Sequence, residues 1–183
     1  MMKDWQIYQN ITRLTYYERP ILTPGMTFDS INSAYSSKSG TKEKMIEAKV
    51  RLMQDMQFVG TSTSGHSLTM DADQESGGRN AGFRPMELLL VGFGGCTGMD
   101  VISILRKKRQ NVTGLEMNVT GEKTDSYPKI YKEVHIEYVV KGKGVQKEAV
   151  ERAIELSLTK YCSVGATLAK AGTITHSFRI VEE

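Results

Sequence analysis

The sequence predicts an α+β fold in which antiparallel strands flank two helical segments. Residues 86–105 are mostly apolar over twenty positions, which favours a long buried helix. Residues 115–122 and 130–140 alternate apolar and polar side chains, as half-buried strands do. Residues 146–160 place apolar side chains at helical spacing. With the strands on either side, the predicted order is β-β-β-α-β-β-α-β.

The chain before the long helix divides into an arm and a small meander. Residues 1–44 carry two prolines, a stretch rich in serine, glycine and lysine, and scattered aromatic residues. We expect an arm that packs on the main body or on a partner subunit, followed by one domain over residues 45–183. Residues 45–53 and 66–71 read as strands, and residues 57–65 supply a further strand and a turn.

The long helix has well-marked ends. Pro85 suits the first turn, Glu87 suits the positive end of the helix dipole, and the basic run at residues 106–109 suits the negative end. An acidic side chain such as Asp100 near a bilayer centre costs about 2.5–3.5 kcal/mol, so we expect a buried soluble helix and no membrane partner. The helix end also explains the basic run without a nucleic acid.

Four glycines lie within this helix, at positions 92, 94, 95 and 98. Each costs about 0.8–1 kcal/mol relative to alanine in a helix interior, so close packing must offset the loss. Because Gly94 and Gly98 share one face, we expect a tight helix–helix crossing beside Cys96. A phosphate-binding loop would need a preceding strand and a basic residue, and neither is present.

Helix and strand signals alternate once more at the C-terminal end. The helical pattern of residues 146–160 continues over residues 162–171, and Gly172 ends it. Residues 173–181 read as a last strand.

Composition indicates an ordinary soluble protein and no charged partner. Of 183 residues, 39% are hydrophobic and 25% are charged, and the net charge is only +3. This charge is too small to favour nucleic acid or an anionic membrane. Residues 1–19 lack the pattern of a secretory signal, and two cysteines are too few for an extracellular disulfide scaffold. We therefore expect a cytoplasmic protein.

Cys96 and Cys162 are the only cysteines, and each lies in an apolar, helix-like segment. They are either small buried side chains without chemistry or a redox pair that passes through sulfenic acid and disulfide states. Asp100 lies on the helical face of Cys96, where we expect a carboxylate paired with a neighbouring group. A metal site built from these three residues and His66 would lack a close-spaced ligand pair, so we expect no metal and no cofactor.

Four stretches carry a resemblance to a known family. They are SGH at 64–66, RPMELLLVGFGGCTGMDVISILRKKRQ at 84–110, YPKIYKEVHIEY at 127–138 and KYCSVGATLAKAG at 160–172. Together they resemble the OsmC/Ohr superfamily (osmotically inducible protein, organic hydroperoxide resistance), and its YhfA-like branch in particular, over roughly residues 45–183. The resemblance implies an intertwined homodimer. In it, two antiparallel sheets wrap the long central helices, and the cysteines meet at the subunit interface.

The activity that the resemblance implies is thiol-dependent reduction of organic hydroperoxides. Cys96 would attack the peroxide and become sulfenic acid, and Cys162 would resolve it as a disulfide that an external dithiol reduces. The apolar side chains Leu89, Phe93 and Met99 would line the substrate pocket. The other hypothesis is a non-catalytic dimer of this fold that binds a small apolar or thiol-reactive ligand.

A peroxidatic thiolate among apolar side chains needs a cationic or hydrogen-bonding partner, because burial raises its pKa. Active members of the family place a glutamate directly after the proline of this motif, where this chain has Met86. Glu87 is one residue further on and is turned by about 100° around the helix, so it cannot simply substitute for that glutamate, and we keep it as a candidate catalytic residue.

The family also places an arginine in the early strands. We favour Arg84 for this role over Arg51 and Arg79, and His66 as a hydrogen-bond partner of the thiol or substrate.

Overall fold

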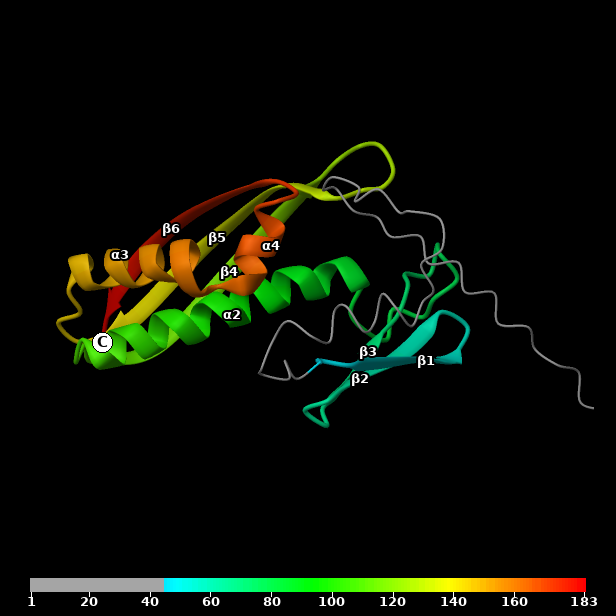
Figure 1. Cartoon of the computed structure of the whole chain (residues 1–183), viewed down its shortest axis with the longest axis horizontal. Coiled ribbons are helices and arrows are strands. Elements are labelled where there is room, and N and C mark those ends of the chain that lie inside the picture. The colour runs from blue at the N-terminus through cyan, green and yellow to red at the C-terminus, as the bar shows by residue number, and fades with distance from the viewer. Residues whose placement is uncertain (1–44) are drawn as a thin grey trace, which may run out of the picture. The chain divides into compact units, whose positions relative to one another are not determined.

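The computed structural model describes residues 45–183, of which Ile46–Glu183 form one compact unit (Figure 1). The predicted arm over residues 1–44 lies outside the described residues. The element order confirms the expected sequence of strands and helices. The elements are β1 (Ala48–Gln54), β2 (Gln57–Ser62), β3 (Ser67–Met70), α2 (Pro85–Lys107), β4 (Val112–Lys123), β5 (Tyr131–Gly142), α3 (Lys147–Leu156), the π-helical turn η1 (Ser157–Tyr161), α4 (Ser163–Leu168) and β6 (Thr173–Glu182).

The strands form two three-stranded sheets. The first has the order β1-β2-β3 and is antiparallel throughout. The second has the order β4-β5-β6, in which β4 and β5 are antiparallel but β5 and β6 are parallel. The parallel pair differs from the wholly antiparallel sheet that we expected. Its cause is the helical connection between β5 and β6, since parallel neighbours need a crossover of this kind.

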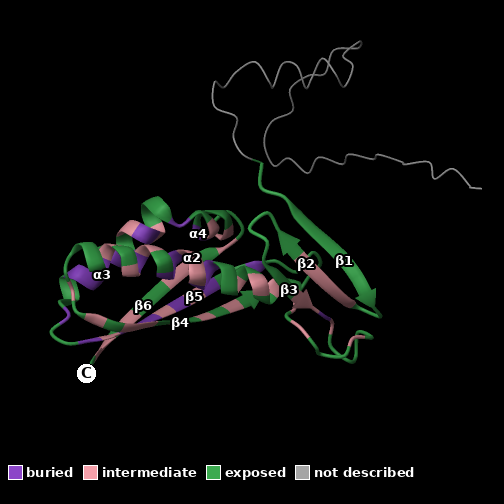
Figure 2. Cartoon of the chain, turned by 90° about the horizontal axis from the view of Figure 1, so that it is seen from below, coloured by how far each residue is buried: buried purple, intermediate pink, exposed green. Residues whose placement is uncertain are grey.

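The core lies between the second sheet and the helices. Helices α2 and α3 cover one face of this sheet in both views (Figures 1 and 2). Strand β5 turns Val134, Ile136 and Tyr138 toward them, and all three are buried. The opposite face is polar, since the ring of His135 lies within hydrogen-bond distance of two hydroxyl groups of β6. This alternation is the one that the sequence of residues 130–140 predicts.

The helix glycines contact a strand and not the expected helix. A Cβ added at Gly94 would lie 3.2 Å from the Val119 side chain, and one added at Gly98 would collide with Met117, so both glycines face β4. The prediction of a helix–helix crossing at these positions was wrong, because this face of α2 lies on the sheet. Helix α2 meets α4 instead at Gly165, where an added Cβ would lie 2.9 Å from the Phe93 ring.

The second helical segment is interrupted at the cysteine. Helix α3 ends at Leu156, and in the π-helical turn the N–H of Cys162 donates to the carbonyl of Ser157 at 2.8 Å. Cys162 itself is extended, with ψ 95°, and begins α4. The π-helical turn and the break after it therefore set the position of the Cys162 side chain. Such single π turns often occur at functional sites.

Among residues 45–183, only α2 is long and apolar enough to cross a membrane, with a hydropathy of 1.8 over its most apolar window. The core helix of a soluble protein gives the same values, and α2 packs on β4.

Candidate active site at the two cysteines

The structure brings Cys96, Asp100 and Cys162 together within one chain. Cys96 and Asp100 are four residues apart on α2, and Cys162 lies between η1 and α4. The two sulfur atoms and a carboxylate oxygen of Asp100 all lie within 4.8 Å of one another. The two thiols therefore lie together, as predicted, and both belong to one chain. The same three groups are the candidate ligands for a metal ion among the described residues, and His66 is not one of them. The expected lack of a metal stays a prediction.

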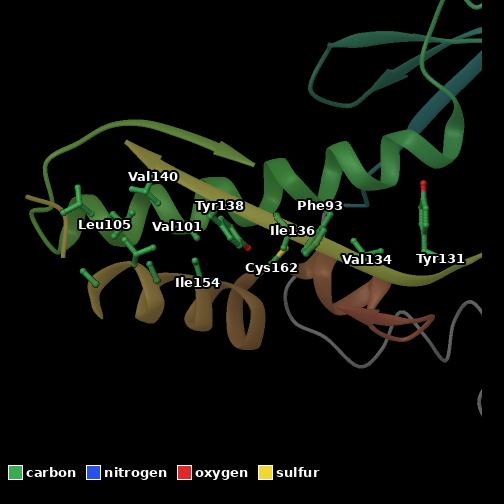
Figure 3. Close-up of a cluster of buried hydrophobic side chains, with 14 residues drawn as sticks. Phe93, Val101, Leu105, Tyr131, Val134, Ile136, Tyr138, Val140, Ile154 and Cys162 are labelled. Atoms are coloured by element: carbon green, nitrogen blue, oxygen red, sulfur yellow. The ribbon is translucent and has the colours of Figure 1, made fainter. Parts of the chain in front are cut away.

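Cys162 is a buried thiol in an apolar setting. Its residue is 2% exposed, and Figure 3 shows it among the core side chains. Burial above all, together with the hydrogen bond with Cys96, raises the pKa of the Cys162 thiol to about 12, against the opposing effect of a hydrogen bond from the Gly165 N–H. That N–H lies 3.3 Å from the sulfur. Among residues 45–183, the groups that shift this pKa include no cation. Cys96 is half-buried and therefore the more accessible thiol.

A chain of buried hydroxyl groups runs from Asp100 into the core. The Ser157 hydroxyl donates to Oδ2 of Asp100 at 2.9 Å. The hydroxyl oxygens of Ser157 and Thr97 are 2.8 Å apart, and those of Thr97 and Tyr138 are 2.6 Å apart. Burial raises the pKa of Tyr138 to about 12, so this phenol stays protonated. The four side chains therefore form one connected network beside the thiols.

This network was missed in the sequence. Thr97 and Ser157 are both fully buried. Thr97 is a polar residue in the apolar helix α2, whereas Ser157 follows a segment that is itself rich in polar residues. Buried hydroxyl groups must be hydrogen-bonded, so Thr97 was the available signal for a polar network in the core. The pairing with Tyr138 depends on a contact between α2 and β5 that no local pattern encodes.

Arg84 is engaged in the loop before α2. Its guanidinium donates to the backbone carbonyls of Asp71 and Gly82 at 3.2 and 3.0 Å, and to the side-chain oxygen of Asn80 at 2.6 Å. It lies twelve residues before Cys96, which is roughly 18 Å along a helix. Within one chain, the structure does not bring Arg84 to the thiols.

The carboxylate of Glu87 caps the start of α2. It accepts a hydrogen bond from the backbone N–H of Arg84 at 2.9 Å, as the third residue of a capping box does. Met86 packs against the core, and its carbonyl accepts a hydrogen bond from the Tyr131 hydroxyl at 3.0 Å. Both residues lie in the first turn of α2, about 15 Å along the helix from Cys96.

The other candidate activating residues are on the first sheet and its loop. His66 is exposed, and its ring lies 3.2 Å from the Ser64 hydroxyl. Arg51 is exposed on β1, and Arg79 pairs with Asp55 at 2.8 Å. The role of His66 at the thiol or substrate stays a prediction, and this residue would have to act on a second chain or after movement of its own.

The three predicted substrate contacts are not in one pocket of this chain. Phe93 is fully buried against Gly165, whereas Leu89 is 42% exposed and Met99 is 73% exposed. Met99 lines a groove of about 420 Å³ between α2 and β4. Only Phe93 is part of the wall that surrounds Cys162 (Figure 3).

The chain thus has a mixed sheet covered by a glycine-bearing helix, whose Cys96 lies beside Cys162 of the second helical segment. The family model described as OsmC-like protein matches residues 77–177. The chain belongs to this family.

Two relatives indicate which branch of the family this chain resembles. Protein YhfA of Escherichia coli K12 is 39% identical over 136 residues, which are 74% of this chain and 98% of the relative. The crystal structure of a hypothetical protein from Aquifex aeolicus VF5 is 35% identical, covers 76% of this chain and 98% of its own, and has a TM-score of 0.68. The resemblance to the YhfA-like branch is therefore confirmed.

A more distant structure shares the fold alone. The organic hydroperoxide resistance protein OsmC of Legionella pneumophila is 14% identical, with a TM-score of 0.58 over 75% of this chain and 98% of its own.

Proposed function

We propose that this protein is a thiol-dependent peroxidase that reduces organic hydroperoxides in defence against oxidative stress. The observation that carries the proposal is the meeting of Cys96 and Cys162, whose sulfurs lie within 4.8 Å. Cys96 attacks the terminal peroxide oxygen, releases an alcohol and becomes sulfenic acid. Cys162 then forms a disulfide with Cys96, and an external dithiol reduces it by exchange. Members of the family are named for resistance to organic hydroperoxides.

The accessibilities of the two thiols support these roles. The half-buried Cys96 can meet a substrate, whereas Cys162, at 2% exposure, can react only with a neighbouring group. A cycle of this kind also needs a reducing compartment, because the pair must return to the dithiol state. We therefore place the reaction in the cytoplasm.

The proposed active form is a homodimer. Gly92 and Gly95 face open space, where an added Cβ would meet nothing within 4 Å. Leu89, Val91 and Met99 lie beside them on α2 and are exposed. A second chain packed on this face would bury these side chains and place its own loop residues near Cys96, including Arg84 or His66. Light scattering tests this state, and a single-chain mass of 20.4 kDa would contradict it.

One observation favours the alternative of a non-catalytic protein that binds a small apolar or thiol-reactive ligand. Cys162 has a pKa raised to about 12 and no cation among the groups that shift it. A protein of this type would hold its ligand beside the thiols and turn nothing over.

Stopped-flow consumption of cumene hydroperoxide in the presence of dithiothreitol separates the two functions. We expect steady turnover by the wild type and a loss of at least about 100-fold in Cys96→Ser, because the nucleophile is removed. Cys162→Ser is the matched variant. In the absence of dithiothreitol, it should still reduce one equivalent of peroxide and leave a sulfenic acid on Cys96 that dimedone traps. No consumption by the wild type, or equal consumption by Cys96→Ser, contradicts the peroxidase.

A further inference from the structure

Asp100 is the carboxylate beside the two thiols, and it has spare hydrogen-bonding capacity. Its carboxylate and both sulfurs lie within 4.8 Å of one another. An ionised carboxylate can accept about four hydrogen bonds. Within residues 45–183, the one hydrogen bond that Asp100 receives on its side chain comes from Ser157, on Oδ2. Its Oδ1 atom is left without a hydrogen-bond donor in this part of the chain.

Closure of the disulfide needs a proton transfer in this confined site. In the proposed cycle, the Cys162 thiol reacts with the Cys96 sulfenic acid to give a disulfide and water. The sulfur of Cys162 must lose its proton, and the hydroxyl group that leaves Cys96 must gain one. Because burial raises the pKa of Cys162 to about 12, free thiolate is scarce at neutral pH. A basic group near both atoms can carry the proton from one to the other.

We propose that Asp100 carries the proton from the Cys162 sulfur to the hydroxyl oxygen that leaves Cys96, an inference that rests on the proposed peroxidase function. A lone pair of the Cys162 sulfur forms the bond to the Cys96 sulfur while the S–O bond breaks, and its electron pair leaves with the oxygen. The carboxylate takes the thiol proton and delivers it to that oxygen, so water departs and the carboxylate is regenerated. The carboxylate holds the proton only until the leaving hydroxyl takes it.

Ser157 acts as a positioning residue in this scheme. Its hydroxyl lies between Oδ2 of Asp100 and the hydroxyl of Thr97, which in turn contacts Tyr138. The chain of three hydroxyl groups fixes one carboxylate oxygen through buried partners. Ser157 also begins the π-helical turn whose last hydrogen bond sets the backbone of Cys162. One residue therefore orients both the carboxylate and the thiol.

The substitution Asp100→Asn tests the proposal, because it keeps the shape and can still accept a hydrogen bond from Ser157. Reduced protein is mixed with one equivalent of cumene hydroperoxide. Dimedone trapping follows the sulfenic acid on Cys96, and the loss of free thiols follows disulfide closure. We expect sulfenic acid formation within about twofold of the wild type and closure at least about tenfold slower. Glu116→Gln, an exposed carboxylate on β4, is the matched control and should change neither rate.

Ser157→Ala is a second variant that keeps the carboxylate. It should slow closure by about threefold while the sulfenic acid forms at the wild-type rate. Closure at or above the wild-type rate in Asp100→Asn, with sulfenic acid still formed, overturns the role of Asp100 and leaves the peroxidase intact. If the wild type forms neither sulfenic acid nor disulfide, the peroxidase itself is wrong, and the proposal for Asp100 is overturned with it.

Discussion

Asp71 and Asp100 are two sheltered carboxylates of this chain with opposite surroundings. Asp71 is 3% exposed and accepts hydrogen bonds from the backbone N–H groups of Ala72, Arg79 and Ala81 at 2.8, 3.0 and 3.0 Å. Asp100 receives one hydrogen bond from a serine and lies beside two thiols. The first carboxylate holds the loop that leads into α2, and the second has an oxygen without a hydrogen-bond donor among residues 45–183.

The comparison shows that a carboxylate with many hydrogen-bond donors serves a structural role, whereas one with few donors can serve a reaction. The Ala81 N–H above all, with those of Arg79 and Ala72 and the charge of Arg84, lowers the pKa of Asp71 against the opposing effect of burial. The negative charge of Asp71 is therefore stabilised by backbone N–H groups. A carboxylate with few donors keeps lone pairs for a reacting group.

The largest effect on folding is expected from Asp71→Ala. The substitution removes the acceptor of three backbone N–H groups at once, so thermal unfolding should show the Tm lowered by roughly 5–10 °C. Asp73→Ala is the control, since this exposed aspartate accepts one backbone N–H, from Ser76. If Asp100→Ala lowers the Tm more than Asp71→Ala does, the contrast between the two carboxylates is wrong.

A smaller effect is expected from Thr97→Val, which removes the middle of the hydroxyl chain without changing its volume much. The buried Tyr138 hydroxyl loses its partner, so the free energy of unfolding should fall by about 1–2 kcal/mol. Urea denaturation measures this difference. An unchanged stability would show that the chain of hydroxyl groups does not hold Asp100 in place.

The smallest effect is expected on the stability of the fold when the pH is lowered. The folded-state pKa of Asp71 is below the ordinary value of 3.8, so its charge stabilises the fold above that value and the contribution is lost as the pH falls through the lowered pKa. We expect the wild type to lose more stability than Asp71→Asn when the pH is lowered from 5 to below 3.8. Equal losses in urea unfolding at the two pH values would refute this.

Much of the fold follows from local sequence patterns. The alternation over residues 130–140 and the apolar run over residues 86–105 correspond to β5 and α2. The parallel pairing of β6 was not predicted, because strand direction depends on the path of the connection and not on the strand itself. The contact of Gly94 and Gly98 with β4 was not predicted either. A small residue indicates close packing, but it does not indicate which element packs against it.

The two thiols of the candidate site were predicted from the sequence, but the structure around them was not. The positions of Cys96 and Cys162 in apolar segments were visible in the sequence. The break between α3 and α4 was not, because it comes from a π-helical turn without proline or glycine. The residues around it, Thr159 to Ser163, include several types of modest helix propensity, which was the weak signal available.

The unequal exposure of the two thiols also sets the direction of the reductive half of the proposed cycle. An external dithiol can reach the half-buried sulfur of Cys96, so Cys162 would be the thiol that departs. A thiol of high pKa leaves slowly unless it is protonated as it leaves, and Cys162 has a pKa of about 12. In the reductive half of the proposed cycle, the departing Cys162 sulfur would therefore need a proton from a neighbouring group as the disulfide opens.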